Sequence, residues 1–103
     1  METINAYEMI QDRIKNGVIM VVAKAHSCAT CTMIVDHLIK TVPYLDRIDK
    51  IQVYVDDMDQ FRGEHVIFSV PTVLIFSEGK EILRESRFIN TDKINRLLSM
   101  LLD

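Results

Sequence analysis

The architecture of this 103-residue chain follows most directly from the run VIMVVAKAHSCATC at residues 18–31. Its first six residues, 18–23, are apolar on both alternations, so residues 18–24 are typical of a central strand covered on both faces. A short link through His26 and Ser27 leads to Cys28-Ala29-Thr30-Cys31, after which apolar residues keep helical spacing up to Thr41. The run therefore predicts a buried strand that leads into a helix, with a C-x-x-C at the junction.

Three further strands are expected downstream, at residues 48–55, 72–76 and 81–87. The tight turn at residues 77–80 makes the last two strands antiparallel. The first two strands enclose a helix, so they should be parallel with a right-handed crossover. Between the second and third strands, residues 56–64 are polar and predict an irregular segment with a short helix closed by Gly63.

Two more helices are expected, one before the first strand and one after the last. Residues 5–15 begin with a possible capping box of Asn5 and Glu8, and Ile4 and Met9 are spaced as a hydrophobic staple. The final helix is capped by Asn90 or Thr91. Apolar positions on one face predict the buried side of each helix: Tyr7, Ile10 and Ile14 in the first, and Ile94, Leu97, Leu98 and Leu101 in the last.

These elements predict an α/β fold: a four-stranded mixed sheet, β-α-β then β-β-α, with an N-terminal helix and helices on both faces. The length suits a single domain over residues 1–103. A net charge of −3 with scattered basic residues argues against nucleic-acid binding. The longest apolar run is too short to cross a bilayer, and residues 1–11 lack the apolar core of a secretory signal. We therefore expect a cytoplasmic protein.

The chain contains only two cysteines, and both lie in the C-x-x-C. A scaffold of structural disulfides would spread its cysteines along the chain, so this placement points to thiol chemistry or metal binding. Cys28 would lie at a helix N-terminus, where the macrodipole favours a thiolate. Cys31, one turn later, could close a disulfide. We predict that Cys28 attacks a substrate disulfide and that Cys31 resolves the mixed disulfide.

Other interpretations of these residues stay open at this stage. The cysteines could form a metal half-site with His26, His37 or His65, although no second ligand pair at knuckle spacing is visible. They could also be two inert buried thiols. His26 is a candidate for tuning the thiolate of Cys28, or else a solvated loop histidine, while His37 and His65 are expected at the surface. The acidic run at residues 56–59 favours a solvated loop over a cation site.

The chain resembles the thioredoxin family over most of its length. The resemblance rests on residues 21–31, on the Val70-Pro71 segment with the strand that follows it, and on Glu78-Gly79-Lys80 at the hairpin turn. It implies a thioredoxin fold and a thiol–disulfide oxidoreductase of cytoplasmic proteins, without a cofactor or metal, as a monomer or weak dimer. It also implies a reductase-like electron donor. A cis Val70–Pro71 bond would face the dithiol, and the Val70 backbone would pair with substrate.

Several positions depart from the family pattern. Ser27 stands in place of a tryptophan, Val22 of a buried aspartate, Gln52 of its partner lysine, Asp36 of a helix-kinking proline, and Arg87 of a glycine in the substrate groove. These changes leave the dithiol intact. They keep open one alternative, a thioredoxin-fold binding or redox-sensing module without general reductase activity. The C-x-x-C itself keeps open another, a small zinc-binding protein.

Overall fold

The computed structural model describes residues 1–103 and contains a five-stranded mixed sheet with the strand order β1-β3-β2-β4-β5. The strands are β1 (Glu2–Thr3), β2 (Val18–Lys24), β3 (Asp49–Tyr54), β4 (Thr72–Ser77) and β5 (Lys80–Ser86). β3 is parallel to both β1 and β2, whereas β4 is antiparallel to both β2 and β5. The predicted parallel β-α-β unit and the antiparallel hairpin are both confirmed.

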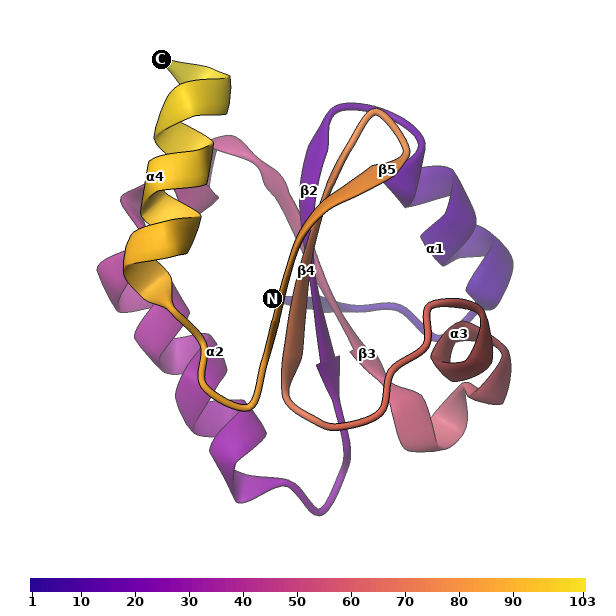
Figure 1. Cartoon of the computed structure of the whole chain (residues 1–103). Helices are drawn as coiled ribbons and strands as arrows, with labels where there is room; N and C mark the ends of the chain where they lie inside the picture. The colour runs from indigo at the N-terminus through magenta and orange to yellow at the C-terminus, as the bar shows by residue number, and fades with distance from the viewer.

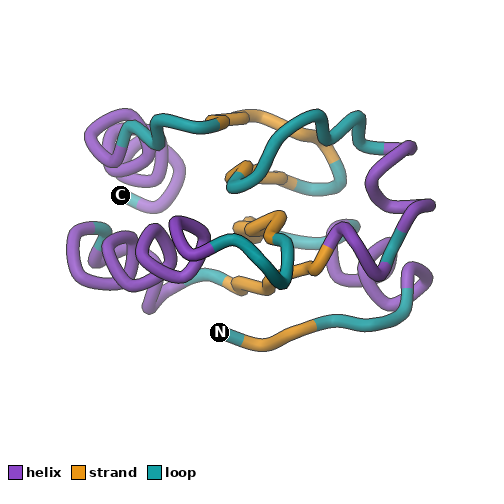
Figure 2. The backbone as a smooth tube through the Cα atoms, turned by 90° about the horizontal axis from the view of Figure 1, so that it is seen from below, coloured by secondary structure: helices purple, strands orange, loops and turns teal.

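Helices cover both faces of the sheet, as predicted (Figures 1 and 2). The α-helices are α1 (Tyr7–Ile14), α2 (Ala29–Thr41), α3 (Asp59–Glu64) and α4 (Thr91–Leu102), and two short 3₁₀ helices are η1 (Pro43–Arg47) and η2 (Val55–Asp57). α2 and α4 lie on one face, and α1 and α3 lie on the other (Figure 1). None of these helices combines the length and apolar composition needed to cross a membrane.

The two faces of β2 supply two separate hydrophobic clusters. Val21 belongs to the cluster under α1 and α3, and its neighbours Met20 and Val22 belong to the cluster under α2 and α4. All three side chains are fully buried. Since the side chains of a strand alternate between faces, an apolar run without alternation is what a strand between two helical layers requires.

The sheet has five strands rather than the predicted four. The additional strand, β1, comprises only Glu2 and Thr3, and the Ile4 amide extends its pairing by donating to the Gln52 carbonyl at 3.1 Å. This segment delays the start of α1 to Tyr7. The predicted cap is therefore wrong: the N-cap position is Ala6, and no side chain caps the helix.

Three other expectations are corrected. Met9 is half exposed, so it forms no hydrophobic staple with the buried Ile4. Gly63 lies inside α3, and Val66 is the residue with positive φ after that helix. Leu101 is 41% exposed because it lies in the last turn of α4, beyond the sheet contact that buries Ile94 and Leu98.

His65 is not the surface residue that the sequence suggested. Its ring packs among three aromatic side chains, at 4.8 Å from Phe61, 5.7 Å from Phe76 and 6.3 Å from Tyr7 between ring centroids. Burial in this aromatic cluster lowers the pKa of His65 below its usual value. A histidine directly after a short helix carries no local signal that strand β4 and helix α1 will close over it.

Candidate active site

The two cysteines lie at the start of α2, just after the loop that follows β2. β2 ends at Lys24, and Cys28 occupies the N-cap position of α2 with extended backbone angles. Cys28 and Cys31 form a disulfide, with their Cα atoms 5.3 Å apart. The central strand thus fixes the start of the helix, and the first helical turn brings the second sulfur to the first.

The two sulfurs differ in their surroundings. Cys31 is fully buried, whereas Cys28 is only partly buried. The Cys28 Sγ accepts a hydrogen bond from the Cys31 backbone N–H at 3.2 Å and lies 3.4 Å from the Thr30 hydroxyl. Both contacts, together with the N-terminal end of the helix dipole, favour negative charge on Cys28 once the disulfide is reduced. The geometry marks Cys28 as the accessible sulfur.

Pro71 lies beside this helix start. The Val70–Pro71 peptide bond is cis, as the family resemblance implies. Pro71 lines one groove together with Thr30, the second of the two residues between the cysteines. Val70 lies outside the strands, and neither its N–H nor its carbonyl forms a hydrogen bond within the chain. An unpaired backbone donor and acceptor therefore stand next to the groove.

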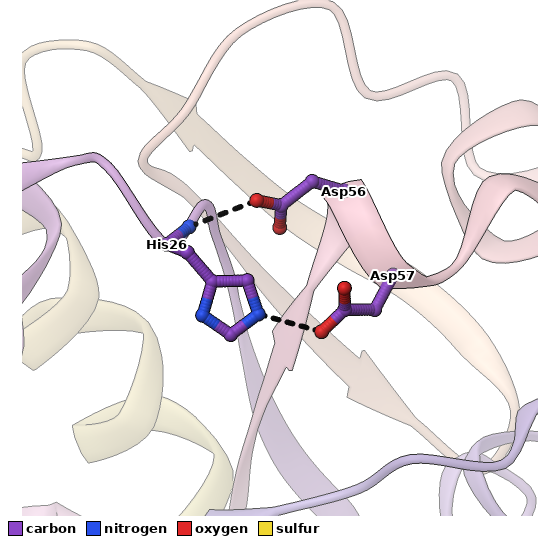
Figure 3. A group of neighbouring side chains, drawn as sticks. All are labelled: His26, Asp56 and Asp57. Atoms are coloured by element: carbon purple, nitrogen blue, oxygen red, sulfur yellow. Dashed lines mark hydrogen bonds and ion pairs between the residues drawn. The ribbon is translucent and has the colours of Figure 1, made fainter.

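His26 is exposed but firmly held (Figure 3). Its ring stacks on Tyr54 with 4.0 Å between centroids, and its Nε2 lies 2.6 Å from a carboxylate oxygen of Asp57. Its backbone N–H donates to Asp56 at 3.1 Å. The hydrogen bond with Asp57 raises the pKa of His26 above its usual value. The ring is thus solvated yet fixed beside two carboxylates, two residues before Cys28.

The structure brings no third metal ligand to the cysteines. The group of His, Cys, Asp or Glu residues close enough to share an ion consists of His26, Asp56 and Asp57, all exposed and without a cysteine. His37 lies on the exposed side of α2, and His65 lies in its aromatic cluster. The pairing of the acidic run with His26 is a contact that the sequence did not reveal.

Two departures from the family pattern occupy the sheet near the dithiol. Val22 is fully buried and lies in register with Gln52 on β3. Lys24 is only 6% exposed, donates to the Gln52 side chain at 3.2 Å, and lies over the Tyr54 ring at 5.3 Å. The sequence does not predict that the Lys24 ammonium is buried at the end of β2. The only sign of it in the sequence is that a lysine follows directly on the apolar run.

The fold and the site together define a class of protein. A central strand leads into a helix whose first turn holds a disulfide-forming cysteine pair, with a cis-proline lining the adjoining groove. This is a thioredoxin-fold protein with a redox-capable cysteine pair.

Comparisons with known proteins agree with this assignment. No protein-family model matches the chain. It is 24% identical to the thioredoxin of Chlamydia trachomatis over 99 residues, which cover 96% of this chain and 97% of that protein. It is 28% identical to the thioredoxin-like protein YdfQ of Bacillus subtilis over 71 residues, which cover 69% of this chain and 63% of that protein.

Solved structures give the same result for the fold. The oxidised thioredoxin of Plasmodium falciparum superposes with a TM-score of 0.82 at 17% identity, covering 100% of this chain and 99% of that one. A thioredoxin variant from Halobacterium salinarum gives 0.82 at 16% identity, covering 99% and 90%. The chain thus has the thioredoxin fold and is similar to thioredoxins, and its Cys28–Cys31 pair supports thiol–disulfide exchange.

Proposed function

We propose that this protein is a thiol–disulfide oxidoreductase that reduces or exchanges disulfides in other proteins. The observation that carries the proposal is the asymmetric disulfide: Cys28 is partly accessible at the helix N-terminus, and Cys31 is fully buried behind it. We also propose that residues 1–103 act as one domain in the cytoplasm, where free thiols are kept reduced.

The reaction takes place in two exchanges. The Cys28 thiolate attacks one sulfur of the substrate disulfide, forms a mixed disulfide and releases the other substrate sulfur as a thiolate. The Cys31 thiolate then attacks the Cys28 sulfur, which closes the internal disulfide and releases the second substrate thiolate. The substrate gains two electrons and the protein loses two. A dithiol donor such as a thioredoxin-reductase-like protein returns them.

Val70 and Pro71 are proposed to align the substrate. The free N–H and carbonyl of Val70 can pair with an extended client backbone in the manner of a β-strand. Pro71 has no N–H of its own, so it offers no competing donor near the sulfurs. His26 is proposed to favour the Cys28 thiolate through the charge that Asp57 helps it to keep.

Trapping experiments test the assignment of the two cysteines. Cys31→Ser should accumulate mixed disulfides with client proteins on non-reducing gels, because attack proceeds and resolution does not. Cys28→Ser should trap nothing and should not reduce insulin with dithiothreitol as the electron source. If the trapping variant were Cys28→Ser instead, the roles would be reversed. If the wild-type protein did not reduce insulin, the alternative function, a thioredoxin-fold binding or redox-sensing module, would be favoured.

A further inference from the structure

The groove beside the dithiol has an unusual lining for a molecule of net charge −3. Its volume is about 340 Å³, and its walls come from α2 and from the loops on either side of the β4–β5 hairpin. No acidic residue contributes to it. The lining residues are Thr30, Met33, Ile34, His37, Pro71 and Arg87. Its only side chain with a permanent charge is the Arg87 guanidinium.

Arg87 occupies a backbone conformation that does not suit it. Its φ of 66° lies in the left-handed region, which side chains other than those of glycine, asparagine and aspartate rarely adopt. Its N–H donates to the Pro71 carbonyl at 3.2 Å, which holds the residue against the cis-proline loop. Non-glycine residues in this region persist where the surrounding structure enforces them, and they cluster at functional sites.

The guanidinium of Arg87 is unengaged. The residue is exposed, and its side chain forms no ion pair and no hydrogen bond within the chain. Four of the other five arginines are held by carboxylates or backbone carbonyls, and only Arg96 on α4 is similarly free. A free guanidinium in a groove offers a planar pair of donors that matches a carboxylate.

Exposed apolar side chains line the groove or lie within three residues of its lining residues in the sequence. Phe88 directly follows Arg87 and is 91% exposed, Phe68 precedes Val70 by two residues and is 87% exposed, and Met33 lines the groove at 69% exposed. Exposed aromatic and methionine side chains are characteristic of surfaces that bind protein segments. The groove is therefore suited to a polypeptide rather than to a small free anion.

We propose that Arg87 selects client proteins with an aspartate or glutamate close to the reacting cysteine. The client segment lies extended along the groove, its disulfide at Cys28, its acidic side chain on the Arg87 guanidinium and its apolar side chains against Phe68 and Phe88. This selection rests on the proposed oxidoreductase function, because it acts on the docking step that precedes attack by Cys28.

The test compares two disulfide-linked peptides that differ only in a glutamate or a glutamine two residues from the reacting cysteine. The readout is the ratio of their second-order rate constants of reduction by the reduced protein. We expect wild type to prefer the glutamate peptide by about three- to tenfold, the range for one charge-assisted contact at a partly exposed site. Arg87→Gln should bring the ratio to about one, Arg87→Lys should keep part of it, and the matched control Arg96→Gln should keep all of it.

The outcomes separate the two proposals. Reduction of neither peptide by wild type would overturn the oxidoreductase function itself. Reduction of both peptides at equal rates, or a preference that survives in Arg87→Gln, would overturn the proposed selection by Arg87 and leave the oxidoreductase function standing. Arg87→Gly gives an independent measurement: it should lose the preference yet melt about 2–5 °C higher, because glycine relieves the left-handed backbone. A lower melting temperature would show that the guanidinium serves the fold, and would overturn the proposal.

Discussion

At the scale of single residues, His26 shows how one contact can set the charge beside a thiol. Asp57 raises the pKa of His26 chiefly through the short side-chain hydrogen bond, against the opposing effects of desolvation and, to a smaller extent, of the Lys24 charge. A histidine whose folded pKa is raised contributes stability that is fully present below its unfolded value of about 6.5. That contribution is lost as the pH rises through the higher folded pKa.

Replacement of Asp57 tests this contact directly. In Asp57→Asn the hydrogen bond loses its charge, so the pKa of His26 should fall towards its ordinary value, as NMR titration of the ring protons would show. The exposed Asp59 provides the matched control, since Asp59→Asn removes the same charge from the neighbouring helix without touching His26. Equal titration curves for His26 in wild type and Asp57→Asn would contradict the assignment.

Val22 carries the second prediction at this scale. Resolution needs a thiolate on Cys31, which is fully buried, and Val22 carries no group that could accept the proton of its thiol. We expect Val22→Asp to release the mixed disulfide faster, because a carboxylate there could accept the proton of the thiol. It should also lower the free energy of unfolding by about 2–3 kcal/mol, since a polar group replaces a packed side chain.

Asparagine at the same position is the control for shape and polarity without a titratable group. Stopped-flow kinetics would measure the lifetime of the mixed disulfide in wild type, Val22→Asp and Val22→Asn. Equal lifetimes in the aspartate and asparagine variants would show that the carboxylate takes no part in resolution.

Individual residues differ in how far the sequence predicts their surroundings. The relation of Cys28 to Cys31 follows from four consecutive residues at a helix start, so local reasoning was sufficient. The stacking of His26 on Tyr54 joins the loop after β2 to the last residue of β3, and no local pattern encodes how these two strands are paired. The same holds for Lys24, whose burial depends on what covers the end of the sheet.

At the scale of elements, two asparagines with the same apparent signal behave differently. Asn90 is the N-cap of α4, and its side chain accepts a hydrogen bond from the Lys93 N–H at 3.0 Å. Asn5 has no such contact, because the helix after it begins at Tyr7 and the preceding residues continue the edge strand. A cap signal in the sequence thus holds only where no tertiary pairing competes for the segment.

This contrast gives a matched pair of variants. Asn90→Ala should lower the free energy of unfolding by about 1 kcal/mol, because an amide at the start of α4 loses its partner. Asn5→Ala should leave the free energy of unfolding within about 0.5 kcal/mol of wild type, as expected for an exposed residue without such a role. Urea unfolding followed by circular dichroism measures both. A larger loss from Asn5→Ala than from Asn90→Ala would contradict the observed capping.

At the scale of the whole molecule, the sequence predicts the helical layers on both faces of the sheet but not the edge strand β1. The uninterrupted apolar run of β2 required helices on both faces, and the order of elements then left few topologies. β1 escaped prediction because two polar residues, Glu2 and Thr3, have no strand pattern of their own. They pair with β3 only once that strand is already in the sheet.

The sheet order therefore predicts a gradient of stability from the centre to this edge. β2 is hydrogen-bonded to β3 on one side and β4 on the other, and it packs into both hydrophobic clusters. Val21 at its centre should exchange its amide hydrogen only through global unfolding, so its exchange free energy should equal that from urea unfolding. β1 has one neighbour and two residues, so it can open while the rest of the sheet stays intact.

Ile4 provides the matched probe for this opening. It is a β-branched, buried residue like Val21, and its amide is also hydrogen-bonded, to the Gln52 carbonyl. We expect the Ile4 amide to exchange about 100-fold faster than the Val21 amide. Separation of β1 from β3 exposes the Ile4 amide without disturbing α2 or α4. Hydrogen exchange followed by NMR would measure both amides in one sample. Equal protection would show that β1 unfolds only together with the sheet, and that the two-residue strand belongs to the same cooperative unit as β2.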